Sequence, residues 1–183
     1  LQFATSASMG RGTVTLNGRG FWLGTVNTAD TAVMATINVL EKGSYLNGGS
    51  GNSYYFGGAF TGSGTMTTAL GNAFAYLTGD MTGFQGAFSH TGDSLFTWAF
   101  GNNTEAVLND GKLFGDGVVL KADGGTSQFK FSYTNDIILM NATVGAEGAL
   151  NARVEQAGTG TLVLTQDNSA TGTLTITSGT VQL

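Results

Sequence analysis

Few side chains in this chain could carry out acid–base or nucleophilic chemistry. His90 is the only histidine, and Ser89 and Asp93 lie close to it in the sequence. A Ser-His-Asp arrangement or an imidazole metal site would have to include His90. The surrounding glycine-rich sequence predicts a turn, and no second metal ligand accompanies the histidine. We therefore expect a locally hydrogen-bonded turn residue and no catalytic or metal-binding role.

The acidic residues show a similar pattern. Asp80, Asp93, Asp110 and Asp116 lie near glycines at turn positions, where a carboxylate can bond the backbone two residues further on. A glycosidase needs two carboxylates on opposite sides of a sugar, and neighbouring coils of a parallel β-helix can supply them. A carbohydrate-active enzyme is thus an alternative hypothesis. We expect dispersed carboxylates and no catalytic residues.

Two glycine-rich stretches could bind a metal or a cofactor. Residues 48–55 are similar to the calcium-binding nonapeptide, but Ser53 stands where the carboxylate ligand belongs and no tandem copy follows. Gly10-Arg11-Gly12 is too short for a dinucleotide-binding motif, because no helix pattern follows it. The sequence therefore predicts neither a metal nor a cofactor.

Exposed aromatic rings could bind sugars, because ring faces pack well on the apolar faces of sugars. Phe21-Trp22-Leu23 places large residues on both faces of one strand, so one of them must point outward. Trp22, Tyr54 and Tyr55 are the predicted exposed contacts. Trp98 follows an alternating pattern and is expected in the core.

Short strands must position these residues. Glycine contributes 30 residues and proline none, which disfavours long helices and provides many turns. Residues 29–42 alternate apolar β-branched and polar side chains, which predicts a strand, although Thr28 and Gly43 could cap a helix. A Gly-Thr pair followed by alternating residues recurs at Gly12–Leu16, Gly64–Met66, Gly160–Leu162, Gly172–Ile176 and Gly179–Leu183.

Three aromatic segments are the strongest core candidates. Phe74–Tyr76, Phe96–Phe100 and Phe129–Tyr133 each place large residues on one strand face. An aromatic side chain buries about 150–250 Å². The sequence therefore predicts a file of aromatic rings inside the molecule.

Internal similarity indicates a solenoid. Residues 78–88 resemble residues 165–174, and both lead from a strand through an Asx turn into glycine and a new strand. A repeat near 20 residues is typical of coils that bury their apolar faces by stacking. We expect one segment over residues 1–183 with Gly-, Asn- and Thr-rich turns. About nine coils would form a rod on the order of 45 Å long.

Residues 158–183 resemble the autotransporter-associated β-strand repeat, also called the passenger-associated transport repeat, and residues 76–88 resemble a divergent copy. The resemblance implies a right-handed parallel β-helix and translocation across a Gram-negative outer membrane. It also implies an extracellular or cell-surface passenger with adhesive or structural roles and no catalytic residues. The sequence contains no recognisable translocator barrel, so we expect membrane contact only through a separate anchor or translocator.

Composition excludes several partners. The net charge of −5, with only seven Lys plus Arg, gives no electrostatic basis for binding nucleic acid. The chain has no cysteine and no apolar run near the roughly 18 residues of a membrane-spanning helix.

Environmental or host glycans and proteins remain possible partners. A second copy, stacked head to tail, is another, because a solenoid without caps exposes unpaired strand edges.

Two non-enzymatic alternatives remain open. The first is a glycan-binding module that uses the exposed aromatic residues. The second is a fragment of an outer-membrane β-barrel, although such a barrel needs strands of about ten residues, and the strands expected here are shorter.

Overall fold

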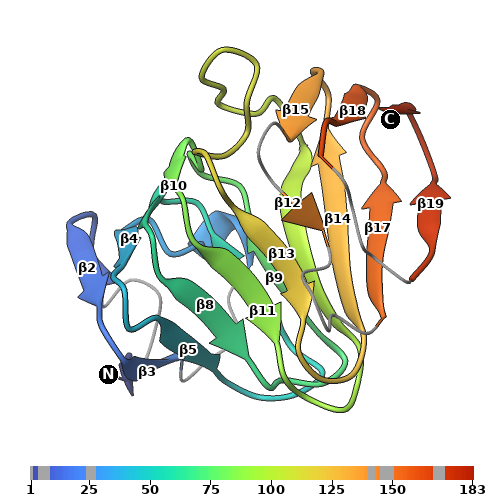
Figure 1. The fold of residues 1–183 in the computed structure, drawn as a ribbon. Coiled ribbons are helices and arrows are strands. Elements are labelled where there is room, and N and C mark those ends of the chain that lie inside the picture. Colours follow the sequence, from blue (N-terminus) through green and yellow to red (C-terminus); the bar gives the residue numbers. More distant parts are fainter. Residues whose placement is uncertain (1, 4–8, 24–27, 140–142, 145–150, 167–171) are drawn as a thin grey trace.

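The chain folds into an all-β parallel solenoid of about six turns (Figure 1). The computed structural model describes residues 2–3, 9–23, 28–139, 143–144, 151–166 and 172–183. Within these ranges no helix is long and apolar enough to cross a membrane.

Four parallel sheets form the walls of the coil. Sheet A contains β1 (Gln2–Phe3), β3 (Arg19–Leu23), β5 (Ser44–Asn47), β8 (Thr65–Thr68), β11 (Ala87–His90), β13 (Val119–Ala122) and β16 (Thr143–Val144). Sheet B contains β2 (Thr13–Leu16), β4 (Thr36–Val39), β7 (Phe60–Gly62) and β10 (Gly83–Phe84). Sheet C contains β6 (Ser53–Phe56), β9 (Ala73–Leu77), β12 (Phe96–Thr104), β14 (Ser127–Tyr133), β17 (Ala152–Gln156) and β19 (Leu174–Ile176). Sheet D contains β15 (Ile137–Leu139), β18 (Thr161–Leu164) and β20 (Thr180–Gln182).

The pairing confirms the predicted parallel solenoid. Each strand pairs in parallel with the corresponding strand of the turn before or after it. Strands of an outer-membrane barrel are antiparallel, so the barrel-fragment alternative is wrong. The right-handed sense of winding stays a prediction, which the rule for parallel crossover connections favours.

The predicted number of coils is too high. Phe96 lies opposite Ala73 of the preceding turn and Ser127 of the following turn. These turns therefore contain more residues than the predicted period of about 20. One reason is the long connection between β12 and β13, in which Lys112 forms a parallel bridge with Ile138 and the Gly115 amide donates to the Phe84 carbonyl.

The strand prediction for residues 29–42 is confirmed only for Thr36–Val39. A 3-10 turn spans Ala29–Thr31, and the Thr28 amide donates to the Thr31 hydroxyl at 2.8 Å. The chain then runs into β4, where Ile37 and Val39 are fully buried. The β-branched alternation outweighs the helix-capping signal because these side chains face the core.

Most glycines of the Gly-Thr pairs, and also Gly86 before Ala87, lie where one turn of the coil touches the next. A Cβ atom on Gly64 would collide with the Leu40 carbonyl, and one on Gly86 would collide with the Gly64 carbonyl. A Cβ atom on Gly12 meets nothing. Glycine is therefore needed where a corner stacks directly on the corner of the preceding turn.

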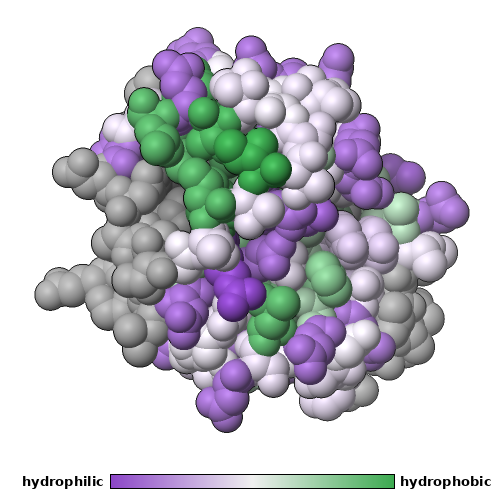
Figure 2. Space-filling view, turned by 90° about the vertical axis from the view of Figure 1, so that its right-hand side faces the viewer, coloured by the Kyte–Doolittle hydropathy of each residue, from purple (hydrophilic) through white to green (hydrophobic). Residues whose placement is uncertain are grey.

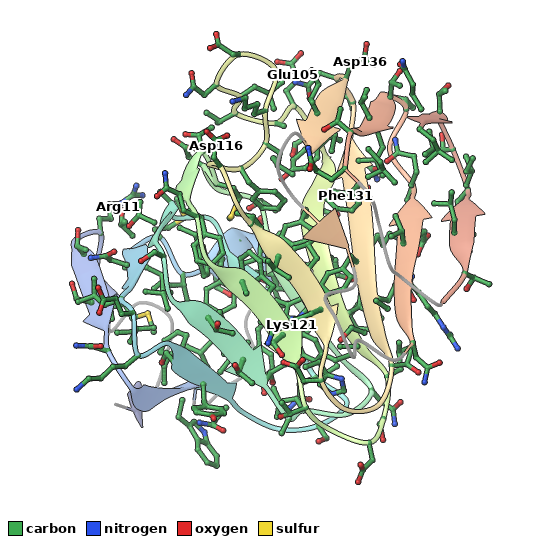
Figure 3. All side chains as sticks on the ribbon, viewed as in Figure 1. Arg11, Glu105, Asp116, Lys121, Phe131 and Asp136 are labelled. Carbon is green, nitrogen blue, oxygen red and sulfur yellow. The ribbon has the colours of Figure 1, made fainter. Side chains whose placement is uncertain are left out.

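Aromatic rings fill the interior as predicted. Phe100 and Phe131 from neighbouring turns stack with centroids 5.2 Å apart, and Phe88 contacts Trp98 at 5.0 Å. Most other ring pairs are tilted or edge-to-face, which the quadrupole of the rings favours. Figure 3 shows Phe131 on β14 directed into the coil.

One of the three aromatic core segments was assigned to the wrong face. In β9, Phe74 is 37% exposed, whereas Ala75 is fully buried. Ala75 lies in register between Tyr54 on β6 and Trp98 on β12. Both of these rings are buried, so the interior has room only for a small side chain at this position, and the aromatic residues of β9 point outward.

Candidate ligand-binding surface

The structure separates the residues of the hypothetical catalytic triad. His90 ends β11 and is fully buried, with Nε2 3.0 Å from the Leu70 carbonyl oxygen. Ser89 points to the other side of the strand and donates to Asp123 Oδ2 at 2.6 Å. The expectation of a locally bonded turn residue is therefore wrong, because the partner of His90 belongs to the preceding turn of the coil.

Burial and hydrogen bonding shift the pKa values of His90 and Asp123. Burial lowers the pKa of His90, and the Leu70 and Thr126 backbones and the charge of Asp93 oppose this effect. Burial would raise the pKa of Asp123, but hydrogen bonds from Lys121 and Ser89 outweigh it and hold the pKa below its usual value.

Two of the four predicted turn aspartates, Asp80 and Asp116, have side-chain partners in the structure. Asp80 Oδ1 accepts from the Thr82 amide at 2.8 Å and from the Thr82 hydroxyl at 2.7 Å, which is the predicted Asx geometry. Asp116 pairs with Lys112 at 3.1 Å, and Asp110 adopts a left-handed turn conformation with φ of 50°. Across the described part of the chain, no group of three or more His, Asp or Glu side chains could hold a metal ion.

Acidic side chains at one edge of the solenoid point into solvent. Figure 3 shows Glu105, Asp116 and Asp136 there, directed away from one another. The Asp136 carboxylate accepts from the Thr161 amide at 2.7 Å, and hydrogen bonds from Thr161 lower its pKa. These carboxylates do not converge on a common point.

Tyr54, one of the three predicted contact residues, is not exposed. Its side chain is 1% exposed, its hydroxyl donates to the Gly49 carbonyl at 3.1 Å, and that hydroxyl also accepts from the Gly49 amide. Tyr54 thus closes the glycine-rich loop that is similar to a calcium-binding repeat. The prediction of Tyr54 as a surface contact is wrong because its strand turns this side toward the core.

The other two predicted contacts lie on different faces. Trp22 is 47% exposed on the outer side of sheet A. Tyr55 is half-buried on the outer side of sheet C. The sequence did not indicate Tyr45, which is also exposed on sheet A, one strand away from Trp22.

Tyr55 belongs to an ordered group of rings, the aromatic row, formed by Tyr55, Phe74 and Tyr76. Tyr55 and Tyr76 lie opposite each other on β6 and β9 and stack with centroids 4.4 Å apart and planes 7° apart. Phe74 and Tyr76, two residues apart on β9, have centroids 5.9 Å apart and planes 13° apart. The three rings are therefore almost parallel.

The hydroxyl of Tyr76 interacts with Tyr55. Partial burial raises the pKa of Tyr76, and the charge of Tyr55 and a side-chain hydrogen bond with Tyr55 raise it further. Stacking and hydrogen bonding together restrict the motion of both rings.

Small residues lie beside the aromatic row. Thr97 and Ala99 on β12 are opposite Phe74 and Tyr76, and both point outward. Each is nevertheless only 1% exposed. Other parts of the chain therefore cover them.

A second group of side chains, the polar cluster, lies on the far side of these small residues. Gln128 and Lys130 on β14 are opposite Thr97 and Ala99, and Arg153 and Glu155 on β17 follow in register. Glu155 pairs with Lys130 at 3.1 Å and accepts a hydrogen bond from Gln128. The outer face of sheet C thus runs from stacked rings on β9, across small residues on β12, to hydrogen-bonding groups on β14 and β17. Figure 1 shows these strands.

The sequence of β9 carries two alternating sets of residues, and either could face the core. Ala73, Ala75 and Leu77 form the alternative alternating set of β9, and all three are buried. Choosing between the two sets required knowledge of the residues opposite, which the sequence pattern does not contain.

A separate apolar surface lies at the end of the solenoid formed by the C-terminal strands. Leu174 and Ile176 on β19 lie in register with Val154 and Gln156, which face the core. Ile176 is 54% exposed because no further strand covers it in the described chain. Figure 2 looks onto this end of the molecule and shows hydrophobic residues gathered there.

Comparison with known proteins identifies one family feature. The model of the passenger-associated transport repeat matches residues 154–183, which run from within β17 through β20. This match confirms the resemblance that the sequence indicated for residues 158–183. No curated protein matches, and no solved structure matches.

The segment 76–88 lies outside that match. Thr78 follows a strand of sheet C, whereas Thr165 follows β18 of sheet D. The two similar segments therefore begin at different corners of the coil. Residues 167–171 of the second segment lie outside the described residues.

Proposed function

We propose that this chain is a non-catalytic structural solenoid from a surface-exposed or secreted passenger protein of a Gram-negative bacterium. The observation that carries the proposal is a passenger-associated transport repeat within a parallel β-solenoid. In such an architecture each turn stabilises its neighbours, so the fold can present a long outer surface without an enclosed active site.

The contacts of the acidic residues support a non-catalytic role. Asp80, Asp123 and Glu155 each accept hydrogen bonds from neighbouring side chains. A glycosidase would instead need a pair of carboxylates free to face a sugar. Incubation with neutral polysaccharides should release no new reducing ends. Release that disappears on replacement of one carboxylate would favour the carbohydrate-active alternative.

Cell fractionation tests the proposed location. An antibody against this chain should label intact cells of the source bacterium or detect the protein in the culture medium. Protease added to intact cells should remove the cell-bound signal, while a cytoplasmic marker stays intact. Detection only in the cytoplasmic fraction would overturn the proposal.

We also propose an adhesive role for the outer surface. Trp22 on sheet A and the aromatic row on sheet C expose apolar rings, which are enriched at sites of molecular recognition. Adhesion of beads coated with the purified chain to host or environmental surfaces tests this role. Beads that bind no better than albumin-coated beads on every surface would argue against adhesion.

Self-stacking into filaments is a second candidate role. The exposed core-facing positions Leu174 and Ile176 favour it, because β19 pairs only with β17 among the described strands and its outer edge can pair with another strand. A second copy is the proposed occupant of this end. Electron microscopy should then show rods of increasing length as the concentration rises.

A further inference from the structure

We propose that the outer face of sheet C binds a neutral polysaccharide. Phe74 and Tyr76 would pack against sugar rings, and the polar cluster of Gln128, Lys130, Arg153 and Glu155 would hydrogen-bond sugar hydroxyls. This inference rests on the proposed adhesive role and names the ligand class for one surface.

The first argument is the exposure of large aromatic rings on a regular strand. Phe74 is 37% exposed although it lies on β9, which has a paired strand on each side in sheet C. Threonine would suit such an outer position equally well in a strand. A local conflict between sequence and burial of this kind is typical of functional positions.

The second argument is rigidity. The near-parallel stack with Tyr55, the hydrogen bond between the two tyrosines and the partial burial of Tyr76 restrict the aromatic row before any ligand binds. A preorganised surface loses less conformational entropy on binding. Flat, rigid rings suit the apolar face of a pyranose ring, whose C–H groups point to one side.

The third argument is the distance between rings and polar groups. Two strand spacings, about 10 Å, separate β9 from β14, and the small residues Thr97 and Ala99 lie between them. A ligand that lies over both strands must reach across this spacing. A chain of linked sugars meets this requirement.

The fourth argument is charge. Lys130 is paired with Glu155, and Arg153 is the only other charged member of the polar cluster. The cluster therefore offers little net charge to attract an anionic ligand, and the whole chain carries −5. Paired amide, ammonium and carboxylate groups can still both donate to and accept from hydroxyls.

Affinity electrophoresis of the folded chain tests this inference. Native gels would contain hydroxyethylcellulose, xylan, laminarin or α-mannan as neutral probes, and alginate as an anionic probe. At least one neutral probe should retard the protein. Phe74→Ala should weaken that binding about tenfold, equivalent to about 1.4 kcal/mol.

Two further variants locate the site. Phe74→Leu keeps apolar area but removes the ring face, so binding should fall while the circular dichroism spectrum stays unchanged. Tyr45→Ala removes an exposed aromatic side chain from sheet A and should leave retardation unchanged.

Three results would overturn the inference. These are no retardation by any neutral probe, stronger retardation by alginate than by every neutral probe, and equal loss of binding in the Phe74 and Tyr45 variants. Cell fractionation tests the proposed location independently. If the protein is found at the cell surface but binds none of the polysaccharides, only the ligand assignment is refuted.

Discussion

At the scale of single residues, His90 has the environment of a neutral core side chain. Its ring lies against Phe96 with centroids 5.6 Å apart, and Nε2 is 3.0 Å from a carbonyl oxygen, which can only accept. Nε2 therefore carries the proton of the neutral ring. A second proton would have to enter a buried nitrogen, which is costly in a core of low polarity.

This environment predicts a pH dependence of stability. Burial lowers the folded-state pKa of His90 below its ordinary value of 6.5, so the unfolded chain takes up the proton first as the pH falls. The contribution of neutral His90 to stability is complete above pH 6.5. It is lost as the pH falls from 6.5 toward the lowered pKa of the folded state. Urea unfolding should therefore give a lower free energy at about pH 5.5 than at about pH 7.

The non-titrating variant His90→Gln provides the control. Its free energy of unfolding should change less over the same pH interval. Asp123 and Asp136 also have lowered pKa values, but the ordinary pKa of an aspartate is 3.8, so these groups lose their contribution only at lower pH. An equal change in wild type and variant would show that another group is responsible.

At the scale of elements, packing between neighbouring turns decides which side of a strand faces inward. The interior row through Tyr54, Ala75 and Trp98 alternates large, small and large side chains on successive strands of sheet C. Interiors are packed as densely as organic crystals, so one strand must supply a small residue between the two large rings. The aromatic row on the outside of β9 follows from this constraint.

Enlarging the small residue should destabilise the fold. Ala75→Phe would place a third ring between Tyr54 and Trp98, and overpacking of this kind typically costs about 1–3 kcal/mol. Phe74→Leu on the outer face should cost less than about 1 kcal/mol. Urea denaturation of both variants checks this order, and a smaller cost for Ala75→Phe would contradict the packing argument.

Close packing at the corners of the coil also predicts the effect of glycine substitutions on stability. Gly86→Ala should lower the melting temperature, because its new methyl group meets the Gly64 carbonyl of the preceding turn. Gly12→Ala has open space, should not be destabilising, and can add about 0.4–1 kcal/mol through the unfolded state. Differential scanning fluorimetry compares the two, and equal shifts would count against the stacked-corner explanation.

At the scale of the whole molecule, the solenoid presents two chemically different surfaces. The outer face of sheet C combines aromatic and polar groups, whereas β19 exposes aliphatic side chains beside an edge that no described strand pairs with. The two surfaces are separate, so the proposed ligand binding and the proposed self-association can be tested independently.

Self-association should depend on the apolar end. Ile176→Lys replaces a side chain that is already half exposed, so it should change stability little but should oppose strand pairing at this edge. Sedimentation velocity should show concentration-dependent growth for the wild type and less for the variant. Monomeric behaviour of the wild type at all concentrations, with only short rods by electron microscopy, would remove the filament proposal.

Patterns in the sequence were sufficient to predict the architecture. Recurrent Gly-Thr pairs, strict alternation in residues 33–39 and the aromatic strands at 96–100 and 129–133 predicted stacked short strands with an aromatic interior. The C-terminal repeat pattern indicated the passenger-associated family feature. These properties are local: strand period, turn chemistry and repeat motif are contained in neighbouring residues.

Which residues are exposed on the outer surface depends on contacts between turns of the coil. An alternating strand has two faces, and its own sequence does not state which face is inside when both carry apolar residues, as β9 does. The side chains opposite decide, so Phe74 and Tyr76 point outward beside Tyr55, while Tyr54 is buried. The candidate binding surface therefore arises from contacts between turns of the coil that are distant in the sequence.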